Sequence, residues 1–513
     1  MYNYVAQTEI FFSKGKHDNE TQNKYDARAA TVAGSVSCVS GETVTKTTTA
    51  AEKIVETTAV ESAGGIREEI PDDLPERDFK GKTFTVLTYD YIKDDYVVEK
   101  ETGDVVSDAI YQRDQNVSER FNANFNYMAD MSFGDTTTFI RKSVMAADDE
   151  YQLIAHHAIA MGTTVMSGYY MNLLDIPYID FEKPWWSRST LEDLTYGNDL
   201  AVFAVGDYSL SSLYGTYCYF YDKKAAEDYH FDNLYDVVND GKWTIDYVKE
   251  LCKPIYIDLN GNAEKDAYDY YGLTQSLYLP LNTYFWAFGG KIFTKDESGI
   301  PELTYKNERT AKIFEEIYNL CFESDGVICE REQYNEISLH DLSSLSFRDN
   351  ISALAPGTLN SAATYFRDKQ NEYGILPYPK LDETQKEYMT MVDGNHAVLA
   401  VPKTVQDTEF AGIMTEALNA ESHKLVIPAY YEIALKKKYT YDDESVRILD
   451  MIVDSRVFDF GYIFDAWQGM SFYPENIMTG KNKQDFESYY AKNSNSAIVY
   501  YKNVMKALEK KYG

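Results

Sequence analysis

Residues 258–269, DLNGNAEKDAYD, carry oxygen-bearing groups at the spacing of a calcium-binding loop. Positions 1, 3, 5, 9 and 12 of such a loop, together with the backbone carbonyl at position 7, correspond to Asp258, Asn260, Asn262, Asp266, Asp269 and Glu264. Two positions depart from the pattern, because Ala263 stands where glycine makes the sharp turn and Asp269 replaces a longer glutamate. Since the loop is single and a strand-like sequence follows it, we expect a weak structural calcium clip rather than a sensor, with a polar turn as the alternative.

The composition of the chain excludes several classes of partner. Its 513 residues include 49 lysines and arginines against 82 aspartates and glutamates, which gives a formal net charge of −33. A field of this sign repels nucleic acid and anionic lipid, so we expect neither as a partner. Aromatic residues make up 15% of the chain, and its 45 tyrosines suit a surface that contacts sugars or peptides. A bias in residue usage without functional meaning would also explain them.

Residues 1–78 are predicted to form a disordered tail or linker, because they are rich in Thr, Ala and Glu and have no sustained apolar face. The stretch after Cys38 is typical of the spacer behind the lipidated cysteine of a bacterial lipoprotein. Residues 35–38 nevertheless make a poor lipidation signal, and no apolar signal segment precedes them. Either the start of the gene is misassigned or disrupted, or Cys38 is incidental. Further along, Cys321 and Cys329 are spaced for a disulfide bridge, with buried free thiols as the alternative.

The elements that must position functional residues follow an α/β pattern. Residues 81–90 and 151–158 are predicted to be buried strands, and residues 103–125 between them are predicted to be an amphipathic helix. This β–α–β order favours a mainly parallel, doubly wound sheet. A second unit of alternating strands and helices follows a long apolar run after residue 200, and Thr244 is a plausible cap for one of its helices. The sequence therefore predicts two α/β lobes joined by several chain crossings.

Several stretches, in their order and spacing, resemble an extracellular solute-binding protein of a bacterial ABC importer, in the maltose-type class. The narrower resemblance is to the long lipoprotein-type members from Clostridia-like bacteria. The stretches that carry it are residues 101–122, 184–209, 233–251, 258–273, 373–383 and 428–464. The resemblance spans residues 79–505, which is nearly everything outside the tail.

The resemblance implies a two-lobed fold of the periplasmic-binding-protein type (type II), each lobe a mainly parallel sheet flanked by helices. It implies three hinge crossings, which we expect near residues 205–207, 354–357 and 401–404. On this mapping, the first lobe holds 79–204 plus 355–400, and the second holds 205–354 plus 401–513. The chain would then be a monomer that captures a small solute, with an oligosaccharide as the favoured candidate. It would deliver the solute to ABC permease subunits from an extracellular, membrane-anchored position.

A sugar-binding cleft needs flat aromatic faces for pyranose rings and planar polar side chains for vicinal hydroxyls. Loops at the carboxyl ends of strands are where ligands meet open α/β sheets. The candidates at such positions are Tyr89, Asp90, His156, His157, Asp207, Tyr208, Trp286, Asn360, Asn395, His396 and Trp467. Alternatives remain open, because Asp207 also suits the satisfaction of hinge amides, and Trp286 and Trp467 also suit packing. Trp243, which opens a predicted helix, is expected to be a core residue.

Two other functions remain as alternatives. A solute-binding protein that reports to a membrane sensor kinase would have the same sequence features as one that feeds a permease. A secreted carbohydrate-active enzyme is less favoured, because the chain has no nucleophile elbow, phosphate loop, zinc signature or eightfold βα repeat. With 82 acidic residues, some pair of carboxylates will lie at catalytic distance by chance. We therefore expect no catalytic residue and no required cofactor apart from the calcium considered above.

Overall fold

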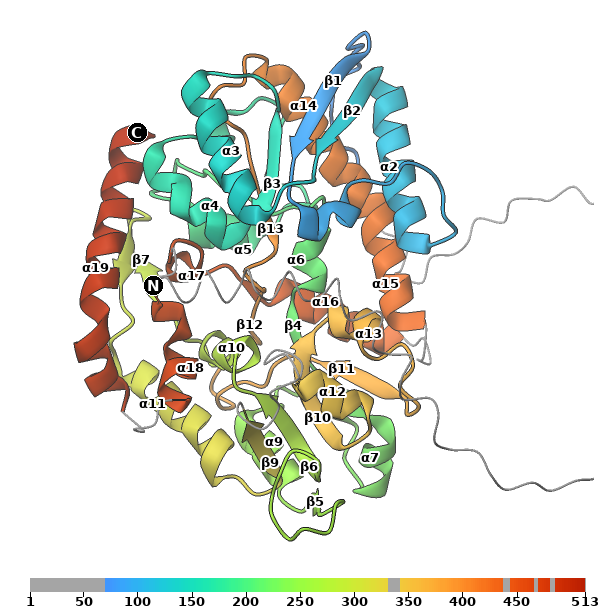
Figure 1. Ribbon diagram of the computed structural model, residues 1–513, viewed down its shortest axis with the longest axis vertical. Helices are drawn as coiled ribbons and strands as arrows, with labels where there is room; N and C mark the ends of the chain where they lie inside the picture. Colours follow the sequence, from blue (N-terminus) through green and yellow to red (C-terminus); the bar gives the residue numbers. More distant parts are fainter. Residues whose placement is uncertain (1–69, 331–341, 437–442, 466–468, 480–484, 513) are drawn as a thin grey trace, which may run out of the picture. The chain divides into compact units, whose positions relative to one another are not determined.

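Two β-sheets, each with its own helices, organise the part of the chain that the computed structural model describes (Figure 1). The described residues are 70–330, 342–436, 443–465, 469–479 and 485–512. Cys38 and Trp467 lie outside them. Among the described residues, no helix combines the length and the apolar character needed to cross a membrane.

The first sheet contains four strands in the order β13-β3-β1-β2. These strands are β1 (Lys82–Leu87), β2 (Ala123–Met128), β3 (Leu153–His157) and β13 (Ala397–Ala400). The strand β1 runs parallel to both β2 and β3, whereas β13 pairs with β3 in the antiparallel sense. Every residue of β3 is buried, as expected for a strand that is covered on both faces.

Helices cover this sheet and are ended by local capping. They are α2 (Val105–Phe121), α3 (Phe133–Ala146), α4 (Ala158–Thr164), α5 (Arg188–Leu194) and α14 (Thr408–Glu421). The side chain of Asp104 accepts a hydrogen bond from the Ser107 N–H at the start of α2, and Asn122 ends that helix in the left-handed conformation. The expected helix at 103–125 thus gives way to β2 two residues beyond Phe121, because Asn122 turns the chain.

The second sheet has β4 (Tyr217–Asp222) near its centre and follows the order β11-β4-β10-β6-β5, with β9 also paired to β6. The other strands are β5 (Tyr256–Ile257), β6 (Tyr270–Ser276), β9 (Val327–Glu330), β10 (Ser352–Thr358) and β11 (Tyr373–Leu376). The strand β10 is parallel to β6 and antiparallel to β4. This sheet is therefore mixed rather than mainly parallel.

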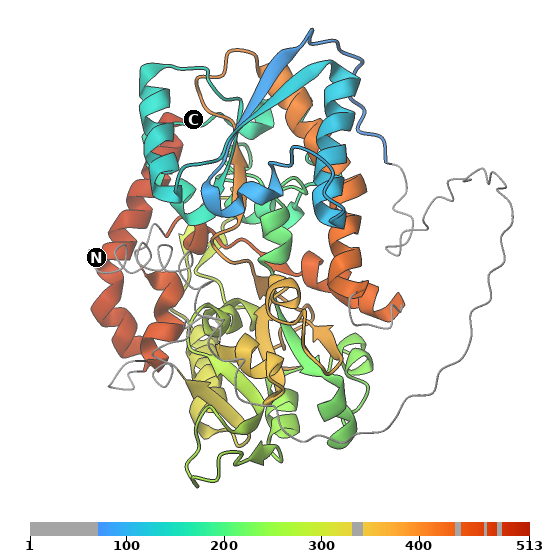
Figure 2. The ribbon, with the colours of Figure 1, turned by 45° about the vertical axis from the view of Figure 1, so that its right-hand side comes forward.

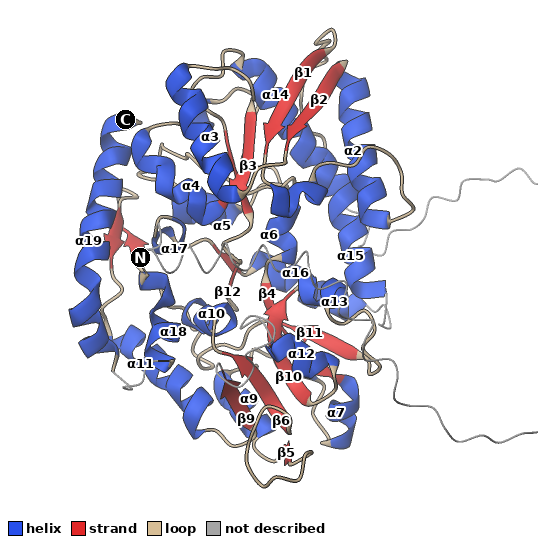
Figure 3. Cartoon of the chain, viewed as in Figure 1, coloured by secondary structure: helices blue, strands red, loops and turns tan. Residues whose placement is uncertain are grey.

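Helices also surround the second sheet, as the separate colours of Figure 3 show. They are α7 (Lys223–Asp228), α8 (Leu234–Asn239), α9 (Ile245–Cys252), α10 (Leu279–Ala287), α11 (Glu308–Tyr318), α12 (Leu342–Arg348), α13 (Asn360–Thr364) and α16 (Asp443–Asp454). The expected cap is present, because the Thr244 side chain accepts from the Tyr247 N–H at 3.3 Å. Trp243 is fully buried, as predicted, and donates from its indole N–H to the Pro377 carbonyl at 2.8 Å.

The sheets divide the chain differently from the expected lobe boundaries. The segment 355–376 was expected in the first lobe, but β10 and β11 both pair with β4 in the second sheet. The segment 408–421 was expected in the second lobe, but Phe410 of α14 packs edge-on against Phe79 at 4.6 Å, beside β1. Both differences have one cause, because a continuous apolar run predicts a buried strand or helix without saying which sheet it joins.

Three stretches of the described residues pass between the two sheets. It passes from Ala204, which bridges to Leu399, to the start of β4 through the short helix α6 (Leu210–Tyr214). This span includes the expected crossing at 205–207. The return runs from β11 to β13 through β12 (Thr390–Met391), which pairs with β14 (Arg456–Val457). The third crossing follows α14, a π-helical turn η7 (Ser422–Val426) and α15 (Ile427–Lys436), which form one long helical rod in Figure 2.

The last helix, α19 (Phe486–Lys511), also runs beside both lobes (Figure 1). Near its start, Phe486 stacks on Phe314 of α11 at 4.7 Å. Just after the end of α19, the Tyr512 hydroxyl donates to the carbonyl of Val165, the residue that follows α4, at 3.0 Å. The remaining short elements are β7 (Phe293–Lys295), β8 (Pro301–Leu303), α17 (Phe460–Ile463), α18 (Tyr473–Met478) and the 3-10 turns η3 (Asp90–Asp95), η4 (Val165–Ser167), η5 (Leu173–Asp175) and η8 (Met470–Phe472); a π-helical turn, η6 (Asn319–Glu323), follows α11.

Two further expectations concern the end of the N-terminal tail and the cysteines. Residues 70–78 were expected to belong to the disordered tail, but ion pairs fix them to the first lobe. These pairs join Asp72 to Arg120, Asp73 to Lys183 and Arg77 to Glu409. No disulfide joins the four described cysteines, so Cys321 and Cys329 are not bridged in this structure.

Candidate functional site

The carboxyl ends of β1 and β3 meet the start of β13, and this meeting brings several predicted residues together. The antiparallel register pairs His157 with Ala397, so the residues just before β13 lie beside the end of β3. The Tyr89 hydroxyl, which follows β1, donates to the Asn395 carbonyl. The Tyr89 ring also meets the His156 ring edge-on at 5.2 Å between centroids.

Three histidines form the floor of this region and are almost completely buried. His156 has its Nε2 at 2.9 Å from the Thr137 hydroxyl, and the Nδ1 of His157 accepts from the Ala160 N–H. The Nδ1 of His396 lies 2.6 Å from the Asp393 carbonyl oxygen, so this nitrogen carries the proton. Burial lowers the pKa of His156 and of His157 to about 3, and the pKa of His396 to about 4. All three rings are therefore neutral at pH 7.

Asp393 stands at the centre of this region, on the crossing that leads into β13. Its Oδ2 accepts from the Tyr217 hydroxyl at 2.9 Å, and its Oδ1 accepts from the Asn395 N–H at 2.9 Å. Its own N–H donates to the Gly215 carbonyl at 2.9 Å, which ties it to the first crossing. The residue as a whole is half-buried, and burial raises the pKa of its carboxyl group. The carboxylate thus lies deep in the molecule.

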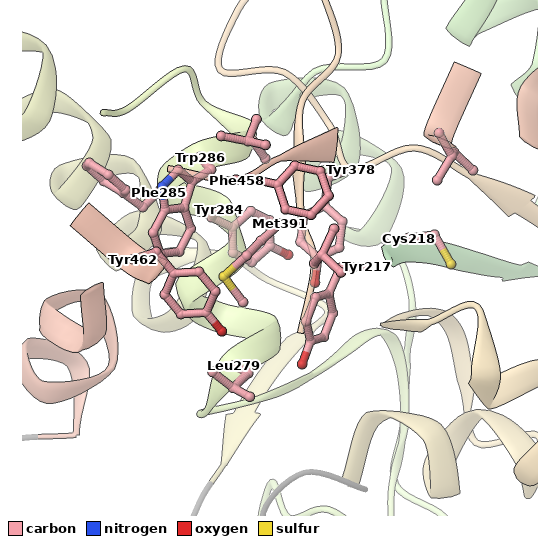
Figure 4. Close-up of a cluster of buried hydrophobic side chains, with 14 of the residues drawn as sticks. Tyr217, Cys218, Leu279, Tyr284, Phe285, Trp286, Tyr378, Met391, Phe458 and Tyr462 are labelled. Carbon is pink, nitrogen blue, oxygen red and sulfur yellow. The ribbon is translucent and has the colours of Figure 1, made fainter. Parts of the chain in front are cut away.

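Gly394 permits a close approach of two side chains to the backbone beside this aspartate. A Cβ atom at position 394 would lie 2.6 Å from Ile159 and 2.7 Å from the hydroxyl oxygen of Tyr462. Figure 4 shows the hydroxyl ends of Tyr217 and Tyr462 on the same side of a buried aromatic cluster that also contains Trp286. The site is therefore shaped by tyrosines from the crossing and from the segment after β14.

A second carboxylate nearby is held in the same way. The Tyr214 hydroxyl, at the end of α6, donates to the Oδ2 of Asp95 at 3.0 Å. Burial raises the pKa of Asp95 to about 7, against the opposing effect of this hydrogen bond. The Tyr214 ring also lies 6.4 Å from the ring of Tyr430 on α15. One short segment, residues 214–217, thus supplies two hydroxyl donors to two carboxylates of the first lobe and its crossing.

The predicted residues of the first crossing lie in a different setting. The Asp207 carboxylate is 2.6 Å from the Nδ1 of His423, in the π-helical turn. Its N–H donates to the Trp185 carbonyl at 2.9 Å. Tyr208 is completely buried, and the Arg113 guanidinium lies over its ring at 4.6 Å. The side chains of Asp207 and Tyr208 therefore contact neighbouring helices. These contacts hold the first crossing in place.

The remaining predicted residues are spread over the two lobes. Trp286 is buried, with its ring 5.3 Å from that of Tyr462, so it belongs to the aromatic cluster behind the site. Asn360 is partly exposed at the start of α13, and Asp90 is exposed at the start of η3. Trp467 lies outside the described residues.

The loop 258–269 is held by hydrogen bonds of its own side chains. Both carboxylate oxygens of Asp258 accept backbone N–H groups, from Gly261 at 2.6 Å and from Ala263 at 2.9 Å. The side-chain amides of Asn260 and Asn262 both donate to one oxygen of Asp266, at 2.9 and 2.8 Å. The binding of calcium by this loop stays a prediction.

Two residues limit how well the loop fits a calcium ion. Ala263 has a φ of 62°, the left-handed conformation that glycine adopts at least cost. Asp269 is buried, and its two oxygens accept from the Leu259 N–H and the Tyr256 hydroxyl at 3.1 and 3.0 Å. Among the described residues, no group of three or more histidine, cysteine, aspartate or glutamate side chains is arranged to hold a metal ion. The donor set that fits calcium here consists of carboxylates mixed with amide and backbone oxygens.

Comparison with known proteins places this geometry in a fold class. No protein-family model and no curated protein sequence matches the chain. Among solved structures, UspC from M. tuberculosis matches with a TM-score of 0.54 at 12% identity, covering 81% of this chain and 100% of that one. The maltose-binding periplasmic protein MalE from Listeria monocytogenes, in complex with maltose, matches with a TM-score of 0.50 at 14% identity, covering 84% of this chain and 99% of that one.

A third structure is an ABC transporter solute-binding protein from Agrobacterium radiobacter K84, in complex with ribitol. It matches with a TM-score of 0.48 at 14% identity, covering 84% of this chain and 100% of that one. The chain has the two-lobed α/β fold of the periplasmic solute-binding proteins, as the sequence predicts.

Asp393, Tyr217, Tyr214 and Asp95 are the site residues that sequence reasoning missed. The dipeptide Asp393–Gly394 is a turn signal just before a predicted strand, and it could have drawn attention to the carboxylate. Nothing in the sequence pattern marks Asp95 or the two tyrosines, because their roles depend on contacts between segments more than a hundred residues apart.

Proposed function

We propose that the protein is the extracellular solute-binding component of an ABC importer, and that it captures a small polar solute, in the first place an oligosaccharide, between its lobes. One observation carries this proposal. The polar groups that remain accessible in the aromatic site around Asp393 and Asn395 lie on the crossing that joins the two sheets. A solute bound at such a position contacts both lobes, so its binding favours their closed arrangement.

The site has the chemistry of binding rather than of turnover. The Tyr89, Tyr214 and Tyr217 hydroxyls all donate to acceptors within the protein. Burial raises the pKa of each of these phenols, so none of them is a nucleophile near neutral pH. Carboxylates beside aromatic rings are the groups that recognise a polyhydroxyl solute through hydrogen bonds and ring faces.

The partner and the location follow from the same proposal. A closed solute-binding protein presents its two lobes to the permease subunits of an importer, and a monomer is sufficient for this step. The acidic chain would work outside the cell, attached to the membrane through a lipidated cysteine if Cys38 carries a lipid. We also propose that the loop 258–269 binds a structural calcium ion, as extracellular calcium is millimolar and a weak site is then occupied.

The proposal predicts reversible binding without chemical change. We expect some oligosaccharides in a panel of neutral and charged glucans, xylans and galactans to raise the melting temperature of the purified protein. The same samples, incubated overnight and analysed by anion-exchange chromatography, should contain the added sugar intact. Release of shorter products by the pure protein would contradict the binding function and show that the protein is an enzyme.

A further inference from the structure

The Asp393 carboxylate has no cationic partner among the described residues. Its two oxygens accept from the Tyr217 hydroxyl and from the Asn395 N–H, and no described ion pair includes it. An ionised carboxylate offers about four lone-pair positions, so about two remain. The residue as a whole is half-buried, and burial raises the pKa of its carboxyl group.

Three other buried carboxylates are paired with a cation or bonded by indole N–H groups. Asp222 pairs with the buried Lys369 at 2.8 Å, and Asp114 pairs with Arg113 at 2.8 Å. Glu416 is completely buried, and its two oxygens accept from two indole N–H groups at 2.8 and 2.9 Å. A buried charge is costly unless it is paired, so a cation from outside the chain would stabilise the Asp393 carboxylate.

Arg456 is the cation on the neighbouring strand, and it is engaged elsewhere. Its Nε donates to the Val453 carbonyl at 2.7 Å, and its Nη1 donates to the Ser212 hydroxyl at 3.2 Å. Asp95, on the other side, adds a second carboxyl group that is also without an ion pair among the described residues. The local groups thus favour an incoming positive charge, and the net charge of −33 acts in the same direction.

Aromatic rings complete the surroundings of the carboxylate. Tyr217 donates to it, and the Tyr462 hydroxyl approaches Gly394 so closely that a Cβ there would lie 2.7 Å away. Trp286 packs on Tyr462 from behind, with 5.3 Å between ring centroids. Figure 4 shows Tyr217 and Tyr462 turning their hydroxyl ends to one side. A carboxylate beside tyrosine hydroxyls is suited to an ammonium group, which gains a charge-assisted hydrogen bond to the carboxylate.

We propose that Asp393 anchors the solute, and that it selects solutes carrying a protonated amine, such as an oligosaccharide with an amino-sugar unit. This inference rests on the proposed solute-binding function and adds the charge of the solute to it. An ammonium adds Coulomb attraction to its hydrogen bond with an ionised carboxylate, so it is preferred over a hydroxyl at the same position.

Calorimetric titration with matched sugars tests this selection. The probes are the disaccharide of glucosamine, its di-N-acetylated counterpart and cellobiose, at a pH where the free amines are protonated. Putrescine and choline form a further arm, which separates an amino sugar from a simple amine as the source of the ammonium group. We expect at least one amine to bind at least tenfold more tightly than the N-acetylated and neutral sugars. Asp393→Asn should remove this difference.

A stability measurement on the unliganded protein provides a readout that needs no solute. If Asp393 is an anchor whose charge is uncompensated, Asp393→Asn should leave the melting temperature unchanged or raise it. The matched control is Asp222→Asn, which leaves Lys369 without its partner and should lower the melting temperature clearly.

Three results would overturn the inference. One is equal binding of amine and neutral sugars, which would leave the proposed solute-binding function in place. Another is a wild-type protein that binds none of the amines. The third is a fall in melting temperature for Asp393→Asn as large as that for Asp222→Asn, which would make Asp393 a structural residue. By contrast, conversion of any sugar to products would remove the proposed function itself.

Discussion

His156, His157 and His396 were considered for direct contact with a solute, and the structure places them beneath the site instead. Each is at least 96% buried, and their rings pack against Tyr89, Phe133 and Phe458. They support the residues at the carboxyl ends of β1 and β3 by filling the space below them. Because they are buried in the neutral form, they also make the stability of the protein depend on pH.

The sign of this dependence follows from the lowered pKa values. An unfolded histidine has a pKa near 6.5, whereas that of folded His156 is about 3, so the unfolded chain binds more protons between these values. The stabilising contribution is complete above pH 6.5 and is lost as the pH falls toward 3. Between pH 7.5 and pH 5, His156 alone should cost roughly 2 kcal/mol of unfolding free energy.

Urea unfolding of the wild type and of His156→Gln at both pH values measures this contribution. We expect the variant to lose less stability on acidification, since glutamine does not titrate. His230→Gln, at an exposed position outside the cluster, is the control and should behave as the wild type. An identical acid loss in the wild type and in His156→Gln would show that His156 is not buried in the neutral form.

At the scale of elements, local patterns predicted more than long-range pairing. The strands at 82–87 and 153–157 and the helix beginning at Val105 were predicted within a few residues, because apolar periodicity and capping side chains are local signals. The segment 354–357 was predicted to be a crossing between the lobes, but it lies within β10. Its actual place between β4 and β6 depends on pairing with residues more than seventy positions away, which no local pattern encodes.

The same distinction explains the site. Tyr89, His156, Asn395 and His396 were predicted because they flank predicted strands whose ends meet in an α/β sheet, and contact of Tyr89 or Asn395 with a solute stays a prediction. Asp393 was missed, since its importance comes from the Tyr217 hydroxyl and from the close approach of Tyr462, both brought in by other segments.

The loop 258–269 allows a prediction at the scale of one element. It connects β5 to β6, and its last acid, Asp269, is already anchored by Tyr256 and the Leu259 N–H. A calcium ion among the oxygens of Asp258, Asn260 and Asp266 would therefore stabilise the start of β6, by mass action on the folded state. Addition of millimolar calcium should raise the melting temperature, and EGTA should reverse the effect.

Ala263→Gly is the matched variant for this measurement. Glycine adopts the left-handed backbone at position 263 with less strain, so the variant should show the larger calcium-dependent shift. A melting temperature that does not respond to calcium in either protein would identify the loop as a polar turn.

At the scale of the whole molecule, the arrangement of crossings determines what motion is available. Two crossings, 205–216 and 389–396, run side by side, because Thr216 bridges to Val392 and the Asp393 N–H donates to Gly215. The third follows the rod of α14 and α15, in which the π-helical turn holds His423 against Asp207. The site lies on these two bonded crossings. Binding of a solute there would therefore change the angle between the lobes directly.

Small-angle X-ray scattering, with and without a saturating solute from the panels above, tests this account most directly. The account predicts a smaller radius of gyration in the presence of a solute that raises the melting temperature, with the solute recovered unchanged. A radius of gyration that stays the same when the site is saturated would contradict capture by closure of the two lobes.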